Sequence, residues 1–141
     1  MPTRKANATW EGGFQQGSGR FEGESGAISG EYSVGSRFGE AGGTNPEELL
    51  AAAHAACYSM ALSGALERAG TPAQRVRTDA ACTVEKQGDG FTITTMKLRV
   101  RVQLPGVDAD TFRRTAEETR TGCPVSRALA GVEIELDAAL E

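Results

Sequence analysis

The amino-acid sequence predicts an α+β fold built as a single domain over residues 1–141. Two stretches, 6–34 and 76–104, alternate apolar or small residues with polar ones and are broken by glycine, which is typical of antiparallel strands joined by tight turns. Between them lies "NPEELLAAAHAACYSMALSGAL", residues 45–66, which has helical character and almost no charge. A chain of 141 residues is long enough to bury one hydrophobic core, and two domains are not expected.

Composition narrows the classes of function. The chain carries 15 Lys and Arg against 19 Asp and Glu, a net charge of -4, and its arginines are scattered rather than clustered. Such a chain offers no basic stripe for phosphate groups, so nucleic acid is not expected as a partner. The first ten residues, "MPTRKANATW", lack the apolar run of a signal peptide, which predicts a cytoplasmic protein.

The first part of the chain is expected to form three short strands, near 5–11, 17–24 and 27–34, where glycine interrupts the alternating pattern. The next segment, "GSRFGEAGGT" at 35–44, has four glycines and no periodicity. It is therefore expected to be a loop.

A long helix is expected over residues 46–69. Its start is marked by a capping residue, a proline at the first helical position and two acidic residues in the first turn, namely Thr44 or Asn45, then Pro46, Glu47 and Glu48. Gly70 is the expected C-terminal cap. At about 24 residues the helix would be roughly 36 Å long, which exceeds the width of a small domain.

This helix is apolar all round and must be covered on every side, which predicts a homodimer or a sheet wrapped around it. Residues 49–66 carry no formal charge and approach the length of a membrane-spanning helix. However, Ala, Ser and Gly dominate the segment, and neither end carries a cluster of Lys or Arg. A buried helix of a soluble protein is therefore favoured over membrane insertion.

The second half of the chain predicts a hairpin, two further helices and a last strand. Residues 76–90 and 91–104 are two alternating runs joined by a glycine turn. One parity of the second run is expected to face the core: Thr92, Thr94, Met96, Leu98, Val100, Val102 and Leu104. An amphipathic helix is expected over 108–119, a short helix starts in "TGCPVSRALAG", and "VEIELDAAL" is expected to be a strand.

Three cysteines are an odd number in a chain without an export signal, so a disulfide framework for folding is not expected. Cys82 lies in the strand-like "AACTVE" and is interpreted as a small, inert hydrophobic residue. Cys123 precedes Pro124, which would place its thiol at a helix N-cap, where negative charge is stabilised and the thiol pKa falls. Cys123 is therefore a candidate functional residue.

Cys57 lies near the middle of the long helix, where apolar surroundings would raise the pKa of its thiol. Chemistry at this thiol needs a cation, and the candidate is Arg37, which Phe38 could shield from water. Glu47 could orient the arginine. Ten positions along a straight helix span about 15 Å, which excludes a direct contact between Glu47 and Cys57. Either the long arginine bridges this distance or the carboxylate comes from a partner chain.

A metal site is a further alternative, because His54 and Cys57 share one helical face and Cys123 could supply a third ligand. The chain has no Cys-x-x-Cys pair, only one histidine and no obvious fourth ligand. A packed or hydrogen-bonded histidine is therefore favoured, and no metal is expected.

Three segments together resemble the OsmC/Ohr family of thiol peroxidases, and specifically its OsmC branch: "ATWEG", "SRFGEAGGTNPEELLAAAHAACYSMALS" and "TGCPVSRAL", in this order and at these separations. The resemblance implies an OsmC-like fold, in which antiparallel sheets wrap around two long central helices in an intertwined homodimer with active sites at the subunit interface. It also implies that Cys57 is the peroxidatic cysteine and Cys123 the resolving one. Arg37 and Glu47 match the arginine and glutamate of the same branch.

The activity that this resemblance implies is the reduction of organic hydroperoxides, and more weakly of hydrogen peroxide, in defence against oxidative stress. The reaction would pass through a sulfenic acid on Cys57 and a Cys57–Cys123 disulfide. It would need no metal, flavin or haem, but an external dithiol or lipoyl-type reductant. Two other functions stay open on the same fold: a non-catalytic dimeric module that binds a hydrophobic small molecule, and a thiol redox sensor.

Overall fold

The computed structural model describes residues 1–141 and divides into two compact units, 1–49 and 50–141. The chain has six strands in two separate sheets, together with four helices, which confirms the predicted α+β class. The assignment of all 141 residues to one domain stays a prediction. Each unit is described by itself below.

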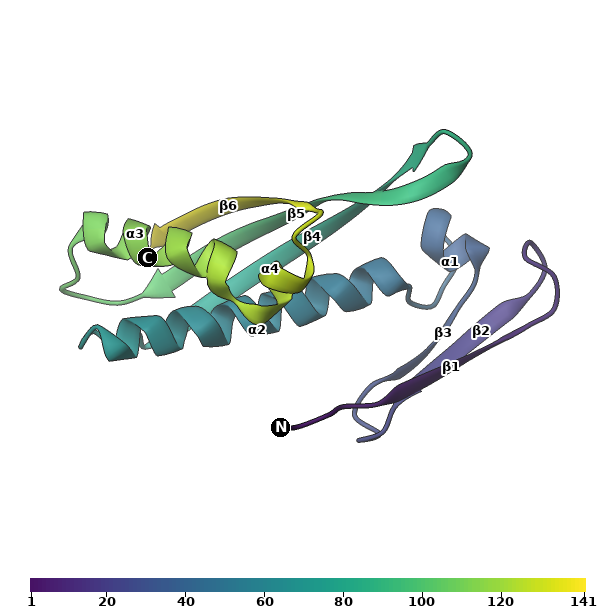
Figure 1. Ribbon diagram of the computed structural model, residues 1–141, viewed down its shortest axis with the longest axis horizontal. Coiled ribbons are helices and arrows are strands. Elements are labelled where there is room, and N and C mark those ends of the chain that lie inside the picture. Colours follow the sequence, from purple (N-terminus) through teal and green to yellow (C-terminus); the bar gives the residue numbers. More distant parts are fainter. The chain divides into compact units, whose positions relative to one another are not determined.

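The first unit contains an antiparallel sheet of three strands in the order β1-β2-β3 (Figure 1). The strands are β1 (Ala6–Glu11), β2 (Ser18–Gly23) and β3 (Ser29–Tyr32), which agrees with the expected ranges. Alternation gives the sheet one polar face and one face with aromatic rings, where the centroids of Trp10 and Tyr32 lie 5.6 Å apart. Gly19 lies beneath these rings, and a Cβ there would come within 2.4 Å of Tyr32. The glycine therefore lets the rings pack onto the strand.

The expected loop at 35–44 is in part a helix, α1 (Val34–Phe38), so that prediction is wrong at its start. The physical reason is a capping box: the Ser33 hydroxyl accepts the Ser36 N–H at 3.1 Å, and the Ser36 hydroxyl accepts the Ser33 N–H at 2.8 Å. The Ser36 hydroxyl also lies 2.8 Å from the Thr44 carbonyl oxygen, and the Asn45 side chain donates to the Ser36 carbonyl at 3.1 Å. These bonds define the course of the segment.

The long helix, α2 (Pro46–Arg68), has the predicted ends. The Asn45 side chain accepts the Glu48 N–H at 2.7 Å, which makes Asn45 the capping residue. Gly70 has a φ of 83°, the left-handed conformation expected of a glycine after a helix.

The second unit contains a sheet in the order β4-β5-β6, formed by β4 (Arg75–Gln87), β5 (Gly90–Gln103) and β6 (Glu133–Leu140). The predicted β4–β5 hairpin is confirmed. The expectation of purely antiparallel sheets is wrong at β6, which pairs with β5 in parallel. The reason is the crossover formed by α3 (Ala109–Gly122) and α4 (Pro124–Ala128), which returns the chain to the starting end of β5.

The predicted core face of β5 is confirmed from Met96 onward, because Met96, Leu98, Val100 and Val102 are all at most 1% exposed. A β-bulge shifts the register earlier in the hairpin, where Thr83 pairs with Thr95 but Val84 pairs with Ile93. Ile93 therefore replaces Thr92 on the face of Met96, and the prediction is wrong for Thr92.

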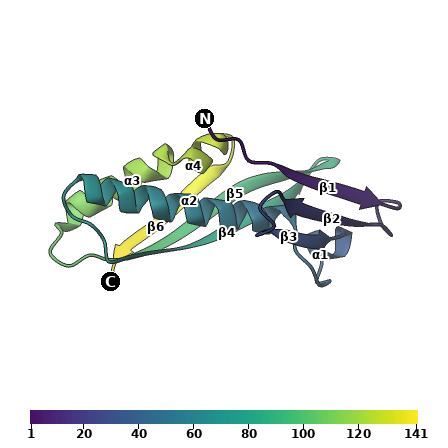
Figure 2. The ribbon, with the colours of Figure 1, turned by 90° about the horizontal axis from the view of Figure 1, so that it is seen from below.

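The core of the second unit forms between this sheet and α2, which runs along one sheet face beside α3 (Figure 1, Figure 2). Tyr58, Leu62 and Leu66 of α2 are completely buried against β5. The Tyr58 hydroxyl donates to the Ala116 carbonyl of α3 at 2.9 Å, which ties the two helices together.

The other side of α2 is uncovered in this single chain, where Met60 is 81% exposed. By length and composition alone α2 could cross a membrane, with 22% of its most apolar window buried. This is weak evidence, since the core helices of soluble proteins pass the same test. The predicted cover from a second chain stays a prediction.

Truncation of the core is expected to lower stability strongly. Leu62→Ala removes a fully buried side chain and leaves a cavity, so we expect a loss of about 3 kcal/mol in the free energy of unfolding. Urea denaturation followed by circular dichroism measures the loss. Glu67→Ala, at an exposed position of the same helix, is the matched control and should change the midpoint little.

Candidate functional site

The first unit joins two of the predicted site residues, Arg37 at the end of α1 and Glu47 in the first turn of α2. The arginine donates to one carboxylate oxygen of Glu47 from Nε at 3.0 Å and from Nη2 at 2.7 Å. Nε also lies 3.2 Å from the second oxygen. Only 7% of the Glu47 side chain is exposed, so the pair is shielded from solvent on the carboxylate side. The expected contact between these two residues is therefore present, and it holds the guanidinium in one orientation.

The side chain of Arg37 is partly exposed to solvent, and its guanidinium also contacts the ring of Phe38. Its central carbon lies 5.1 Å from the centroid of the Phe38 ring, which agrees with the expected shielding role of Phe38. The bonds to Glu47 use Nε and Nη2, which leaves Nη1 as a donor for a further group.

An apolar hollow of about 460 Å³ lies beside Arg37 within the first unit. Its walls are mostly aromatic or aliphatic side chains: Trp10, Phe14, Tyr32, Val34 and Phe38. Arg37 is the charged residue in its lining. A hollow of this kind suits a molecule with an organic group at one end and a polar oxygen at the other.

The second unit joins the other two predicted site residues. Cys57 is on α2 and is half-buried, whereas Cys123 is the N-cap of α4 and is 1% exposed. Both are free thiols, and Cys123 lies close enough to Cys57 to raise the pKa of the Cys57 thiol. The Ser126 N–H donates to the Cys123 sulfur at 3.4 Å, which confirms the predicted N-cap position. Two thiols 66 positions apart (123 minus 57) are thus neighbours.

The surroundings of Cys57 oppose its ionisation within this unit. Burial raises the pKa of the Cys57 thiol, and the neighbouring Cys123 raises that pKa further, while the Val125 backbone amide lowers it. Burial is the largest of these effects, so the thiol stays protonated at neutral pH unless a cation stabilises the thiolate.

His54 lies one helical turn before Cys57 and is completely buried. Its Nε2 lies 2.7 Å from the Ser126 hydroxyl, which is itself 3.2 Å from the Cys123 sulfur. The favoured interpretation of His54 as a hydrogen-bonded histidine is confirmed. The structure gathers no group of three His, Cys, Asp or Glu side chains that could hold a metal ion.

Ser126 was not among the site residues predicted from the sequence, although its spacing from Cys123 was a weak signal for a contact between the two side chains. It is the third residue after the N-cap Cys123, the spacing at which a cap and a side chain of the first turn contact each other. Two further residues near Cys57 in sequence, Tyr58 and Met60, lie on different sides of α2. Tyr58 is in the core, and Met60 is on the exposed side of α2. Cys82 packs against the core from β4, as expected of a small hydrophobic residue.

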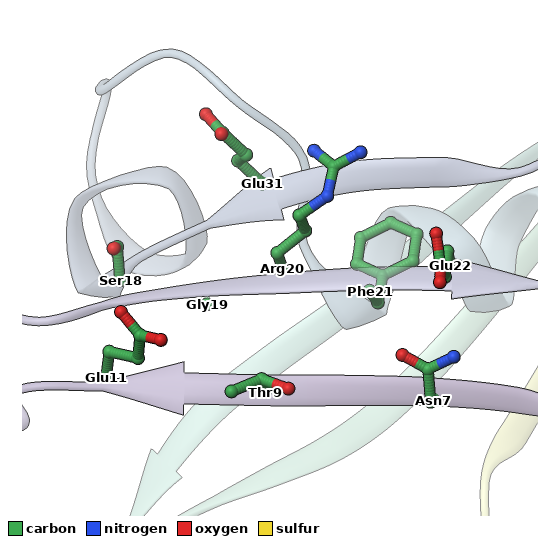
Figure 3. Close-up of a pocket in the computed structure, with 9 residues that line it drawn as sticks. All are labelled: Asn7, Thr9, Glu11, Ser18, Gly19, Arg20, Phe21, Glu22 and Glu31. Atoms are coloured by element: carbon green, nitrogen blue, oxygen red, sulfur yellow. The ribbon is translucent and has the colours of Figure 1, made fainter.

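A second hollow of about 460 Å³ lies on the polar face of the first sheet. Figure 3 shows Asn7 and Thr9 of β1, Arg20 of β2 and Glu31 of β3 around it. It is open and polar, and none of the predicted site residues lines it. It is therefore not the candidate site.

Comparison with known proteins gives matches along nearly the whole chain. A family model described as "OsmC-like protein" matches residues 39–137. The protein named peroxiredoxin OsmC of Escherichia coli (strain K12) is 44% identical over 135 residues, covering 95% of this chain and 94% of that protein. The organic hydroperoxide resistance protein of Xanthomonas axonopodis pv. citri (strain 306) is 31% identical over 130 residues, covering 89% and 87%.

Solved structures share the fold. The organic hydroperoxide resistance protein OhrB of Bacillus subtilis superposes with a TM-score of 0.74 at 23% identity, over 96% of this chain and 98% of that one. An organic hydroperoxide resistance protein from Elizabethkingia anophelis superposes with a TM-score of 0.75 at 24% identity, over 100% and 98%. At these identities the likeness shows the fold alone, and it confirms the expected arrangement of two sheets and helices.

Proposed function

Because this chain belongs to the OsmC-like protein family, we propose that it is a cysteine-based peroxidase that reduces organic hydroperoxides, and more weakly hydrogen peroxide, to alcohols and water. The names of its relatives, peroxiredoxin and organic hydroperoxide resistance protein, support a peroxidase-type function. The role is defence against oxidative stress in the cytoplasm, where dithiol systems keep thiols reduced.

The observation that carries the proposal is the contact between the thiols of Cys57 and Cys123. The two residues come from different helices, and the second is held at a helix N-cap by a backbone N–H. Two free thiols that lie near each other are the starting point for a disulfide. A packing role alone would not require two thiols to meet in this way.

In the first step, Cys57 attacks the peroxide. The thiolate sulfur displaces one peroxide oxygen, the O–O bond breaks, and the second oxygen leaves as an alcohol or as water after taking up a proton. Cys57 becomes a sulfenic acid. Arg37, oriented by Glu47, stabilises the thiolate and donates a hydrogen bond to the peroxide; a single arginine serves both because it has several N–H groups and stays charged when desolvated.

In the second step, Cys123 attacks the sulfenic sulfur of Cys57. A disulfide forms and water leaves, which protects Cys57 from further oxidation to the sulfinic level. An external dithiol, including one of the lipoyl type, then reduces the disulfide and restores both thiols. This sulfur chemistry needs no metal, flavin or haem.

The apolar hollow beside Arg37 supports the proposed preference for organic over inorganic peroxide. An alkyl or aryl group gains free energy by leaving water for the walls formed by Trp10, Phe14 and Phe38. Hydrogen peroxide has no such group and gains nothing from these walls. The hollow therefore supports a discrimination in favour of the organic substrate.

The proposed working form is a homodimer, in which a second chain covers the exposed side of α2. The exposure of the apolar side chain of Met60 on this largely apolar helix supports the homodimer. Light scattering after size exclusion should give twice 14.8 kDa. A mass of one chain at micromolar concentration would remove the basis for a site shared between subunits.

The experiment that tests the proposed function is a single-turnover reaction. Reduced protein is mixed with one equivalent of cumene hydroperoxide, the rate of peroxide loss is followed, and the thiols are mapped by peptide mass spectrometry. We expect a fast reaction and the loss of two hydrogens, located between the peptides of Cys57 and Cys123. Cys57→Ser provides the inactive reference, and Cys82→Ser should behave like the unaltered protein.

Two outcomes would contradict the proposal. If all three thiols survive, Cys57 is a packing residue and the chain is a binding module. If the disulfide forms but a dithiol supports no repeated turnover, the chain is a redox sensor rather than a peroxidase.

A further inference from the structure

A buried histidine is linked to the resolving thiol through one hydroxyl group. His54 Nε2 lies 2.7 Å from the Ser126 Oγ, and this oxygen lies 3.2 Å from the Cys123 Sγ. His54 is 0%, Ser126 3% and Cys123 1% exposed, so the three groups contact each other away from solvent. Their connection spans two elements, α2 and α4, that lie far apart in the sequence.

The other ring nitrogen of His54 argues against a purely structural role. Nδ1 is buried and has no hydrogen-bond partner. An unpaired buried polar atom destabilises a fold, and an apolar side chain of similar size would avoid the penalty. The presence of an imidazole at this position is therefore best explained by what Nε2 does toward Ser126.

The protonation state of the ring suits an acceptor. Burial lowers the pKa of His54 below its ordinary value, so the imidazole is neutral at pH 7 and one ring nitrogen has a free lone pair. If Nε2 is this nitrogen, the Ser126 hydroxyl donates to it, and the Ser126 oxygen is free to accept the proton of the Cys123 thiol.

We propose that Ser126 and His54 take the proton of the Cys123 thiol when that thiol attacks oxidised Cys57. Ser126 contacts the reacting sulfur, and His54 acts through Ser126 as a positioning and proton-accepting residue. This inference rests on the proposed peroxidase function and assigns two residues to its second step.

The proposed step begins with two coupled proton transfers. The thiol proton of Cys123 passes to the Ser126 oxygen while the Ser126 proton passes to His54 Nε2. The resulting thiolate accepts hydrogen bonds from the Ser126 hydroxyl and from the Ser126 N–H, which lies 3.4 Å from the sulfur. The sulfur then bonds to the Cys57 sulfur and the S–O bond of the sulfenic acid breaks. The leaving hydroxide takes up the proton that the imidazolium gives back through Ser126, so water leaves and His54 is neutral again.

Other ionisable groups face the same region and must be separated from His54 in any pH study. Cys57 and Tyr58 lie on α2, and the charges of Glu117 and Arg120 on α3 act on Tyr58. None of these groups contributes to the lowered pKa of His54, whose cause is burial. A difference between the pH profiles of the unaltered protein and of a His54 variant can therefore be assigned to this ring.

The test separates the two steps in time. Reduced protein is mixed with one equivalent of cumene hydroperoxide, and peroxide consumption and disulfide formation are followed independently, the latter by acid quenching and mass spectrometry. His54→Gln keeps a polar group near Ser126 but cannot take up a proton, and Ser126→Ala removes the link. Thr94→Val is the matched control, because it removes the other buried polar side-chain atom without a partner, Thr94 Oγ1.

We expect disulfide formation to be about 100-fold slower at pH 7 in His54→Gln and in Ser126→Ala, a contribution usual for a general base. The slowing should fall on disulfide formation rather than on peroxide consumption. Between pH 7 and 9 the unaltered protein should show a nearly constant rate, whereas His54→Gln should gain about tenfold per pH unit. Rates and pH profiles equal to those of Thr94→Val would overturn the inference. If the unaltered protein consumes no peroxide, the proposed function itself fails, and the two failures are thus distinguishable.

A second measurement needs no variant and no peroxide. His54 is the only histidine of the chain, so protein without a histidine tag gives one set of imidazole nitrogen signals in a nuclear magnetic resonance spectrum. The inference requires an unprotonated Nε2 in the reduced protein at pH 7. A proton found on Nε2 would overturn it, because that nitrogen could not then accept another.

Discussion

Arg37→Ala is expected to reduce the rate of reaction with an organic hydroperoxide at pH 7 by about 100-fold, which corresponds to two units in the pKa of the attacking thiol. The reason is the balance of effects on Cys57, whose pKa is raised by burial and by the neighbouring Cys123. A thiol with a raised pKa is protonated at pH 7 and reacts slowly, since the thiolate is the nucleophile. The proposed role of Arg37 is to reverse this shift.

The pH profile gives the sign of the effect. In Arg37→Ala the thiolate appears only as the pH rises through the raised pKa, so the rate should recover in alkaline solution and approach that of the unaltered protein. Stopped-flow measurement of peroxide loss from pH 6 to about 10 tests this, since each unit below the pKa costs about a tenfold fall in thiolate. Arg20→Ala, on the exposed polar face of the first sheet, is the matched control.

The loss of Arg37 also removes the partner of Glu47, whose side chain is only 7% exposed. An unpaired carboxylate at this position destabilises the fold. The double variant Arg37→Ala/Glu47→Gln removes that charge and separates stability from reactivity. If it is folded and reacts as fast as Arg20→Ala at pH 7, Arg37 does not activate Cys57.

Cys123→Ser is expected to convert a recycling enzyme into one that is inactivated by its substrate. One equivalent of peroxide should still oxidise Cys57, because the first step does not use Cys123. No disulfide with Cys123 can follow, so Cys57 stays a sulfenic acid until an external thiol reaches it, and a second equivalent of peroxide can oxidise it irreversibly to the sulfinic level. With excess peroxide and a dithiol present, the variant should lose most of its activity within a few turnovers.

Intact-protein mass spectrometry distinguishes these products, because the sulfenic acid adds one oxygen atom and the sulfinic acid adds two. Cys82→Ser is the control, since Cys82 packs against the core from β4. Its oxidised form should show the loss of two hydrogens and should keep turning over. Sustained turnover by Cys123→Ser without added oxygen would mean that Cys123 is not the resolving residue.

Local signals in the sequence predict most of the elements. The start of α2 follows from Asn45, Pro46 and the two glutamates after it, and its end follows from Gly70. The N-cap position of Cys123 follows from Pro124 in the same way. Each of these depends on a few neighbouring residues, which is why the sequence is sufficient.

The wrong predictions have two causes. In one case two local signals compete, and in the others the structure depends on contacts between residues that are distant in sequence. In α1 the glycines of "GSRFGEAGG" suggest a loop, but the reciprocal bonds of Ser33 and Ser36 prevail at its start. The bulge that turns Ile93 to the face of Met96 depends on pairing with β4, and the parallel direction of β6 depends on the crossover through α3 and α4. Periodicity along one strand contains neither piece of information.

In the candidate site, too, some residues could be predicted from the sequence and others depend on contacts that only the fold creates. Cys57 and Cys123 could be selected by residue type and by the resemblance, and Arg37 with Glu47 by chemistry. The signal for Ser126 is weak, because a serine three positions after a cysteine is common. The hydrogen bond of His54 could not be predicted, because it becomes evident only when α4 packs against α2.

The parallel pairing of β6 also determines when the thiols can meet during folding. The β4–β5 hairpin joins neighbouring segments and can form early, but β6 must wait until residues 104–132 have folded back across the sheet. Cys123 belongs to this crossover segment, whereas Cys57 belongs to α2, which precedes it in the chain. The native arrangement of the two thiols therefore depends on the last part of the chain to be synthesised.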